Sequence, residues 1–131
     1  MGKRATARRL AMQAIYQADI SKTAIDQALD NLFEEEDISE ETKAFARHLA
    51  RGTQDNVISL DKRIEQLSKD WSIDRINTIN KSILRIAFYE LLHEKDTPKA
   101  VVINEALELA KRYSDAESAK FINGILGSAV V

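Results

Sequence analysis

Residues 81–94 read KSILRIAFYELLHE, and this stretch decides the fold. A helix built from it is apolar on nearly every side, because its apolar residues are Ile83, Leu84, Ile86, Ala87, Phe88, Leu91 and Leu92. A helix of this kind is surrounded by neighbours, whereas a surface helix keeps one polar face in water. We therefore expect residues 81–94 at the centre of a core to which several other helices contribute.

The composition of the whole chain agrees with a helical domain. Its 131 residues include no cysteine, one proline and four glycines, and 44% of them are hydrophobic. A chain of this length buries roughly two-thirds of the surface that it exposes when unfolded, which is enough for one core. No stretch alternates apolar and polar residues between turns, as strands do. We predict an all-α fold in which residues 1–131 form a single domain, a bundle of about seven helices.

Apolar residues at spacings of three and four predict the helices that surround the central one. They are expected over residues 3–20, 23–33, 39–67, a short segment from about residue 74, 98–113 and 115–129. Ser39 is expected to be the N-cap of the long third pattern, because two glutamates follow it at the positive end of the helix dipole. Gly52 is expected to kink or interrupt that pattern, since the apolar positions resume after it.

Helix starts are also predicted in the second half of the chain. Ser72 is a candidate cap for the short segment. Thr97 is the expected N-cap of the next helix, with Pro98 at its first position, where the missing N–H costs nothing. Ser114 and Glu117 have the spacing of a capping box, in which each side chain bonds a backbone N–H of the other residue.

Several classes of function are disfavoured by the residues that the chain lacks. Without cysteine there is no disulfide and no thiolate site, and His48 and His93 are the only imidazoles, so we expect neither a metal nor a cofactor. Glu90 and His93 have the Glu-x-x-His spacing of metal ligands in di-iron helical bundles, but such a site needs two copies of it. Glu105 and Glu108 lack convergent polar partners, so we do not expect an enzyme. No run is apolar enough to span a membrane and no signal peptide is present, which favours a cytoplasmic protein.

Charge is distributed unevenly along the chain. The formal net charge is −2, yet residues 1–18 contain Lys3, Arg4, Arg8 and Arg9 and no acidic residue. Residues 23–42 contain eight acidic residues and no lysine or arginine. The first segment can attract phosphate, and the second should repel it.

The basic first helix has the residue types that bind single-stranded RNA. On a helical wheel Arg8, Met12, Tyr16 and Arg9 fall on one arc, which combines planar cations with a flat ring for a base. The alternative is an ordinary solvated helix end.

Near the other end of the chain, Lys120, Asn123, Gly124 and Gly127 form a low helix face that another backbone or a ligand could approach closely. Tight packing against a neighbouring helix within the domain explains the same pattern.

Six stretches of the chain form a recognisable set: RRLAMQAIY at 8–16, ILRIAFYEL at 83–91, DTP at 96–98, VINEA at 102–106, ELAK at 108–111 and KFINGIL at 120–126. Together they resemble the NusB family of transcription antitermination factors. The resemblance implies an all-helical protein without enzymatic activity. It also implies binding to the single-stranded boxA element of nascent RNA, as a heterodimer with the ribosomal protein NusE.

The resemblance further implies that such a complex helps RNA polymerase to read through terminators in ribosomal RNA operons. Some members of the family self-associate, so a homodimer is a further expectation. Combined with the charge pattern, the resemblance makes the RNA-binding candidates Lys3, Arg4, Arg8, Arg9, Tyr16, Lys120 and Phe121. Candidates for the NusE-facing side are Asn80, Lys81 and Glu117.

The chain departs from the family pattern at three places. Ala5 and Thr6 stand where relatives often have further arginines, Asn80 stands at a frequently acidic position, and Gly127 stands where an aspartate is usual. The competing hypothesis is a helical protein–protein adaptor without a direct RNA role, which the acidic segment 23–42 favours.

Overall fold

The core is organised around helix α5, Thr78–His93, as the sequence predicts. The computed structural model describes residues 2–69 and 71–129, and within them it contains seven α-helices, one short 3-10 helix and no strand. The other elements are α1 (Lys3–Ser21), α2 (Ile25–Glu34), α3 (Glu40–Asp55), α4 (Val57–Ser68), η1 (Ile73–Arg75), α6 (Lys99–Tyr113) and α7 (Ala116–Ala129). The predicted all-α class and the seven helices are confirmed.

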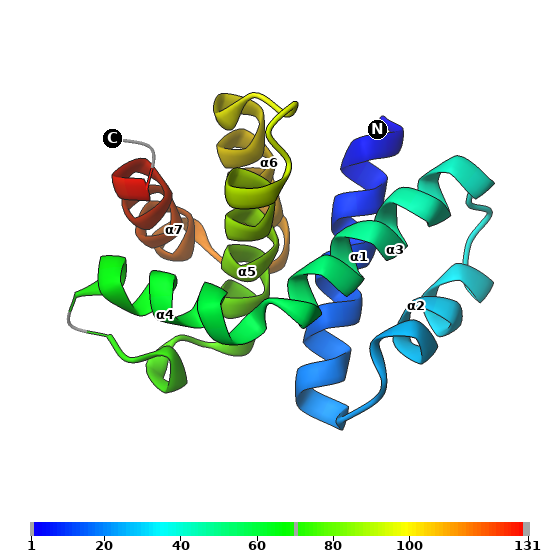
Figure 1. The fold of residues 1–131 in the computed structure, drawn as a ribbon, viewed down its shortest axis with the longest axis horizontal. Coiled ribbons are helices and arrows are strands. Elements are labelled where there is room, and N and C mark those ends of the chain that lie inside the picture. The colour runs from blue at the N-terminus through cyan, green and yellow to red at the C-terminus, as the bar shows by residue number, and fades with distance from the viewer. Residues whose placement is uncertain (1, 70, 130–131) are drawn as a thin grey trace.

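Helices α1, α3, α4, α6 and α7 all pack against α5 (Figure 1). Every residue from Ser82 to Glu90 is buried, including the polar ones. In the view of Figure 1, α1, α2 and α3 lie on one side of α5, whereas α4 and α7 lie on the other. The two ends of the chain therefore meet different sides of one central helix.

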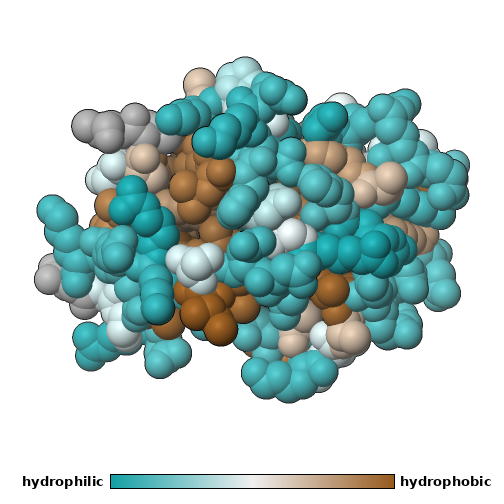
Figure 2. All heavy atoms as spheres, viewed as in Figure 1, coloured by the Kyte–Doolittle hydropathy of each residue, from teal (hydrophilic) through white to brown (hydrophobic). Residues whose placement is uncertain are grey.

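The outer surface is mostly polar. Figure 2 shows hydrophilic residues over most of one face, with hydrophobic residues visible in small areas between them. Large hydrophobic residues with considerable exposure are Ile20, Ile58, Trp71, Leu92 and Val101. Among residues 2–69 and 71–129 no helix combines the length and the apolar character that crossing a bilayer requires.

The structure confirms one predicted helix cap in the first two-thirds of the chain and corrects the start of two other elements, η1 and α5. The Ser39 side chain accepts a hydrogen bond from the Thr42 N–H at 3.2 Å, so that cap is confirmed. Helix α5, however, begins at Thr78, because Asn77 accepts from the Asn80 N–H at 2.8 Å and extends the helix toward its N-terminus. Ser72 was predicted to cap the short segment, but its side chain makes no such bond.

The predicted caps of α6 and α7 are wrong in detail. Pro98 itself takes the N-cap position of α6, with an extended backbone (ψ 137°), and no side chain caps this end. At α7 the Asp115 carboxylate accepts from the Ser118 N–H at 2.7 Å, whereas Ser114 Oγ donates to Ser118 Oγ. The bond from the Ser118 backbone lowers the pKa of Asp115. Glu117 is therefore not part of a capping box and remains exposed.

Gly52 does not interrupt the third helix. Helix α3 continues through it to Asp55, and the break falls at Asn56, whose Nδ2 donates to the Gly52 carbonyl at 2.7 Å. Glycine is needed here because the ring of Tyr89 lies directly against its Cα, where a Cβ would overlap the ring. The glycine thus permits close packing of α3 on α5, which the sequence pattern alone does not reveal.

Substituting Gly52→Ala should therefore destabilise the fold by about 1–3 kcal/mol, since the buried Tyr89 ring must move to admit a methyl group. Gly124→Ala is the matched control, because nothing lies within 4 Å of a Cβ at that helical position. The control should gain about 0.5–1 kcal/mol from reduced backbone entropy of the unfolded chain. Urea denaturation of both variants measures the difference, and equal stabilities would contradict the close packing.

Candidate nucleic-acid interface

The basic residues at the start of α1 lie in three different environments. Lys3 Nζ lies 2.9 Å from the Glu41 carboxylate, and Arg9 Nη2 lies 2.9 Å from that of Glu36. Arg4 is exposed, and its guanidinium lies 3.8 Å from the centre of the Phe45 ring. Lys3 and Arg4 are therefore at the surface, whereas the Arg9 side chain is only 12% exposed. Carboxylates of the acidic segment hold both Lys3 and Arg9.

Arg8 points into the protein. Its Nε and Nη2 donate to the two oxygens of Glu90 at 2.7 and 3.0 Å, and its Nη1 lies 3.8 Å from Glu105. The side chains of Arg8 and Glu90 are only 5% and 1% exposed. The prediction that Arg8 contacts RNA is wrong, because the guanidinium already forms a buried, bidentate ion pair between α1 and α5.

The acidic segment does more than repel phosphate. Besides pairing with α1, it binds basic residues of α3: Arg47 lies 3.0 Å from Asp26 and 2.7 Å from Asp30, and Arg51 lies 2.8 Å from Asp26. The hydrogen bond from Arg51, with a smaller contribution from Arg47, lowers the pKa of Asp26. The surface of α1, α2 and α3 is thus a network of ion pairs.

The predicted arc of α1 is partly inside the core. Met12 is buried, as is Arg8, so the arc does not form one RNA-facing stripe. Tyr16 is half-buried and lines a hollow of about 220 Å³ together with Ile20 and Ile79. Tyr16 therefore stays partly accessible, about 18 Å along the helix from Arg4.

Lys120 and Phe121 occupy the outer side of α7. Lys120 is exposed, whereas Phe121 is half-buried and packs edge-on against Trp71, with ring centres 6.3 Å apart and an interplanar angle of 68°. The predicted low face of the same helix is open, because nothing lies within 4 Å of a Cβ placed on Gly124 or Gly127. Tight packing within the domain does not explain those glycines.

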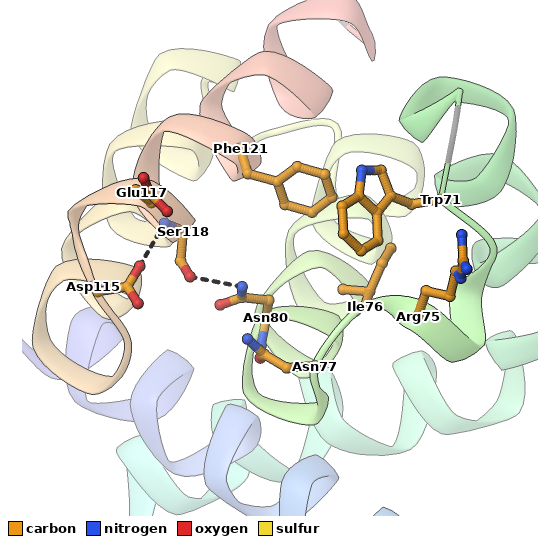
Figure 3. Close-up of a pocket in the computed structure, with 9 residues that line it drawn as sticks. All are labelled: Trp71, Arg75, Ile76, Asn77, Asn80, Asp115, Glu117, Ser118 and Phe121. Carbon is orange, nitrogen blue, oxygen red and sulfur yellow. Dashed lines mark hydrogen bonds between the residues drawn. The ribbon is translucent and has the colours of Figure 1, made fainter.

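Two of the three predicted partner-facing residues share one hollow with Phe121. Its volume is about 290 Å³, and its lining is Trp71, Arg75, Ile76, Asn77, Asn80, Asp115, Glu117, Ser118 and Phe121 (Figure 3). Asn80 is buried and donates to Ser118 Oγ at 2.8 Å, while its Oδ1 has no hydrogen-bond partner within residues 2–69 and 71–129. Lys81 does not line this hollow, and its Nζ lies 3.7 Å from Asp19 of α1.

Sequence reasoning missed Trp71 and Arg75, which the short η1 segment brings to the rim of this hollow. The available signal was a single tryptophan in a polar stretch between two predicted helices. It also missed the role of Glu90, which the Glu-x-x-His spacing had suggested only as a metal ligand. Within residues 2–69 and 71–129, no three metal-ligating side chains come together.

Comparisons with known proteins give one consistent result. Residues 5–130 match the NusB family. The chain is 43% identical over 130 residues to the transcription antitermination protein NusB of Acetivibrio thermocellus, covering 99% of this chain and 89% of that protein. It is 39% identical to NusB of Bacillus subtilis over 126 residues, covering 96% and 93% of the two chains.

Solved structures agree with the sequence comparison. A NusB structure from T. maritima superposes with a TM-score of 0.90 at 35% identity, covering 98% of this chain and 89% of that one. A structure of antitermination factors NusB and NusE in complex with dsRNA also has a TM-score of 0.90, at 26% identity, covering 98% and 96%.

The all-helical fold shared with solved NusB structures, together with the sequence match, defines the class as transcription antitermination proteins, which is not a family of enzymes. The chain belongs to the NusB family of transcription antitermination factors.

The buried ion pair gives a stability prediction. Arg8→Ala leaves the Glu90 carboxylate buried without its partner, which should cost about 3–5 kcal/mol. Replacing both residues, Arg8→Met with Glu90→Leu, removes the two charges together and should restore most of that loss. Urea denaturation measures both variants. If the free energy of unfolding of Arg8→Ala stays within about 1 kcal/mol of the parent value, the ion pair of Arg8 with Glu90 does not stabilise the fold.

Proposed function

We propose that this chain binds the single-stranded boxA element of nascent RNA and acts with NusE in the antitermination complex of RNA polymerase on ribosomal RNA operons. The observation that carries the proposal is the exposed Arg4 guanidinium over the Phe45 ring at the start of α1. A guanidinium held against a ring keeps its N–H edge available for phosphate and its outer face available for a base.

Further contacts come from the surface that the structure leaves exposed. Lys120 supplies a second cation, while Tyr16 and Phe121 supply partly exposed aromatic rings for stacking. Lys3 and Arg9 contribute only when phosphate replaces Glu41 and Glu36 as their partners. RNA affinity of the isolated chain is therefore modest, because few cations are available without breaking an existing ion pair.

The first turn of α7 supports the placement of NusE. Glu117 is exposed there beside Asp115, so this side of the hollow offers two carboxylates to a basic ribosomal protein (Figure 3). Such a protein would extend the positive surface along the same RNA strand. By linkage, RNA then strengthens the contact between the proteins by the same factor by which NusE strengthens RNA binding.

The first test is salt dependence. Each phosphate contact to a single strand contributes about −0.7 to the slope of log affinity against log salt. Arg4→Gln should therefore weaken boxA binding and make that slope shallower by about 0.7. Arg112→Gln is the matched control, because Arg112 is also exposed and also lies over a ring, that of Tyr113 at 5.1 Å. Equal slopes in both variants would remove Arg4 from the interface.

The acidic segment provides a second test. Glu36→Gln with Glu41→Gln frees Arg9 and Lys3, and should raise RNA affinity about threefold, the scale of exposed ion pairs. The hydrogen bond from Lys3 also lowers the pKa of Glu41.

The control for this test changes net charge equally. Glu34→Gln with Glu35→Gln removes two exposed acids of the same segment, for which the described residues show no ion pair. The same gain in both double variants would mean that only the overall charge matters, and not the pairing with α1.

The third test concerns NusE. Glu117→Gln should weaken NusE binding measured by calorimetry and leave the thermal midpoint unchanged, since Glu117 caps nothing. Glu108→Gln, at another exposed site, should have no effect on NusE binding. Unchanged affinity in Glu117→Gln would place the NusE contact elsewhere. NusE binding without any RNA binding would favour an adaptor instead.

A further inference from the structure

Trp71 is the single tryptophan of the chain, and its position is unusual for so large an apolar residue. It is 49% exposed, although the neighbouring Ile76 is buried. The Phe121 ring packs against the indole of Trp71 in a T-shaped arrangement. The indole therefore keeps a considerable part of its surface open to solvent while a second aromatic residue fixes its orientation.

The hollow beside Trp71 has two different sides. Figure 3 shows Asp115 and Glu117 on one side, Trp71 and Arg75 on the other, and Phe121 between them. The volume of about 290 Å³ is at the lower limit of ordinary small-molecule sites, which suits one ring system better than a peptide segment. A phosphate would avoid the acidic side and approach beside Arg75.

The base of the hollow is formed before any ligand arrives. Asn80 is 5% exposed and is fixed by its hydrogen bond to Ser118, which Asp115 in turn anchors through the Ser118 N–H. Among the described residues, none donates a hydrogen bond to the buried Asn80 Oδ1. Buried polar atoms without a partner are uncommon in folded proteins, and one beside an open hollow is an independent indication of a ligand with N–H groups.

We propose that this hollow receives one unstacked RNA base, which lies against the indole of Trp71 while Arg75 contacts the adjoining phosphate. The proposal rests on the proposed function and adds to it a binding site formed by Trp71 and Arg75. Single-stranded RNA is recognised mainly through bases stacked on aromatic side chains, with cations along the backbone. Lys120 is exposed next to Phe121 on α7 and supplies a further cation for the backbone of such a strand.

A basic side chain of a protein partner is the competing occupant, because it could bind the acidic side. The aromatic and basic side favours the base, since Arg75 would repel a second cation placed on the indole. The two occupants are distinguished by the intrinsic fluorescence of Trp71, which reports on this hollow alone because the chain has no other tryptophan.

The experiment titrates the full chain with an unlabelled single-stranded boxA RNA and, separately, with NusE alone. RNA should quench the Trp71 fluorescence with the same midpoint that labelled RNA gives in an anisotropy assay. In that assay Trp71→Leu should lose between about fivefold and a hundredfold in affinity, whereas Trp71→Phe should keep most of it, because phenylalanine retains a stacking ring. Ile58→Ala, at a 74% exposed position of α4, should bind as the parent does.

Each other outcome overturns the proposal in a recognisable way. If labelled RNA binds but neither quenches Trp71 nor loses affinity in Trp71→Leu, the hollow is not a base site and the proposed function stands. If NusE alone changes the fluorescence and RNA does not, the occupant is a partner side chain. If no variant and no parent protein binds RNA at any salt concentration, the proposed function itself fails. Circular dichroism of Trp71→Leu confirms that the comparison is made on folded protein.

Discussion

The need to cover α5 on every side is the constraint on which the rest of the structure depends. A helix this apolar cannot leave a face in water, so five other helices must reach it. Polar groups drawn into the same layer must then find partners inside it, as Glu90 does with Arg8. The functional surface is built from what remains outside: helix starts, the η1 segment and the outer turns of α1 and α7.

This constraint explains how much of the fold could be predicted. The helices and the central place of residues 81–94 follow from apolar spacing, which is a property of each segment by itself. Gly52 and Arg8 could not be placed correctly, because their roles depend on Tyr89 and Glu90, which lie far away in the sequence. A glycine in a helix signals a kink unless the neighbour that lies against it is known.

The candidate site shows the same division. Lys120 and Phe121 are neighbours on α7, one exposed and the other half-buried, and a pattern local to that helix is enough to single out the pair. The hollow that joins Asn80, Glu117 and Trp71 requires three separate segments to meet, and no spacing within one helix encodes it. The four basic residues at the start of α1 look equivalent in sequence, but their environments in the fold differ. Arg8 is buried in an ion pair, Lys3 and Arg9 are paired with acidic residues, and Arg4 is exposed.

The carboxylates around α1 and α3 act as built-in counterions. A polyanion that binds an ordinary basic surface releases dissolved ions, and the entropy of their dilution favours binding most at low ionic strength. Here part of the positive charge is neutralised by side chains that are tethered to the same molecule and cannot diffuse away. Added salt screens those internal pairs as well as the attraction to RNA, so the two effects partly offset each other. This surface should therefore discriminate between ligands by shape and stacking more than by total charge.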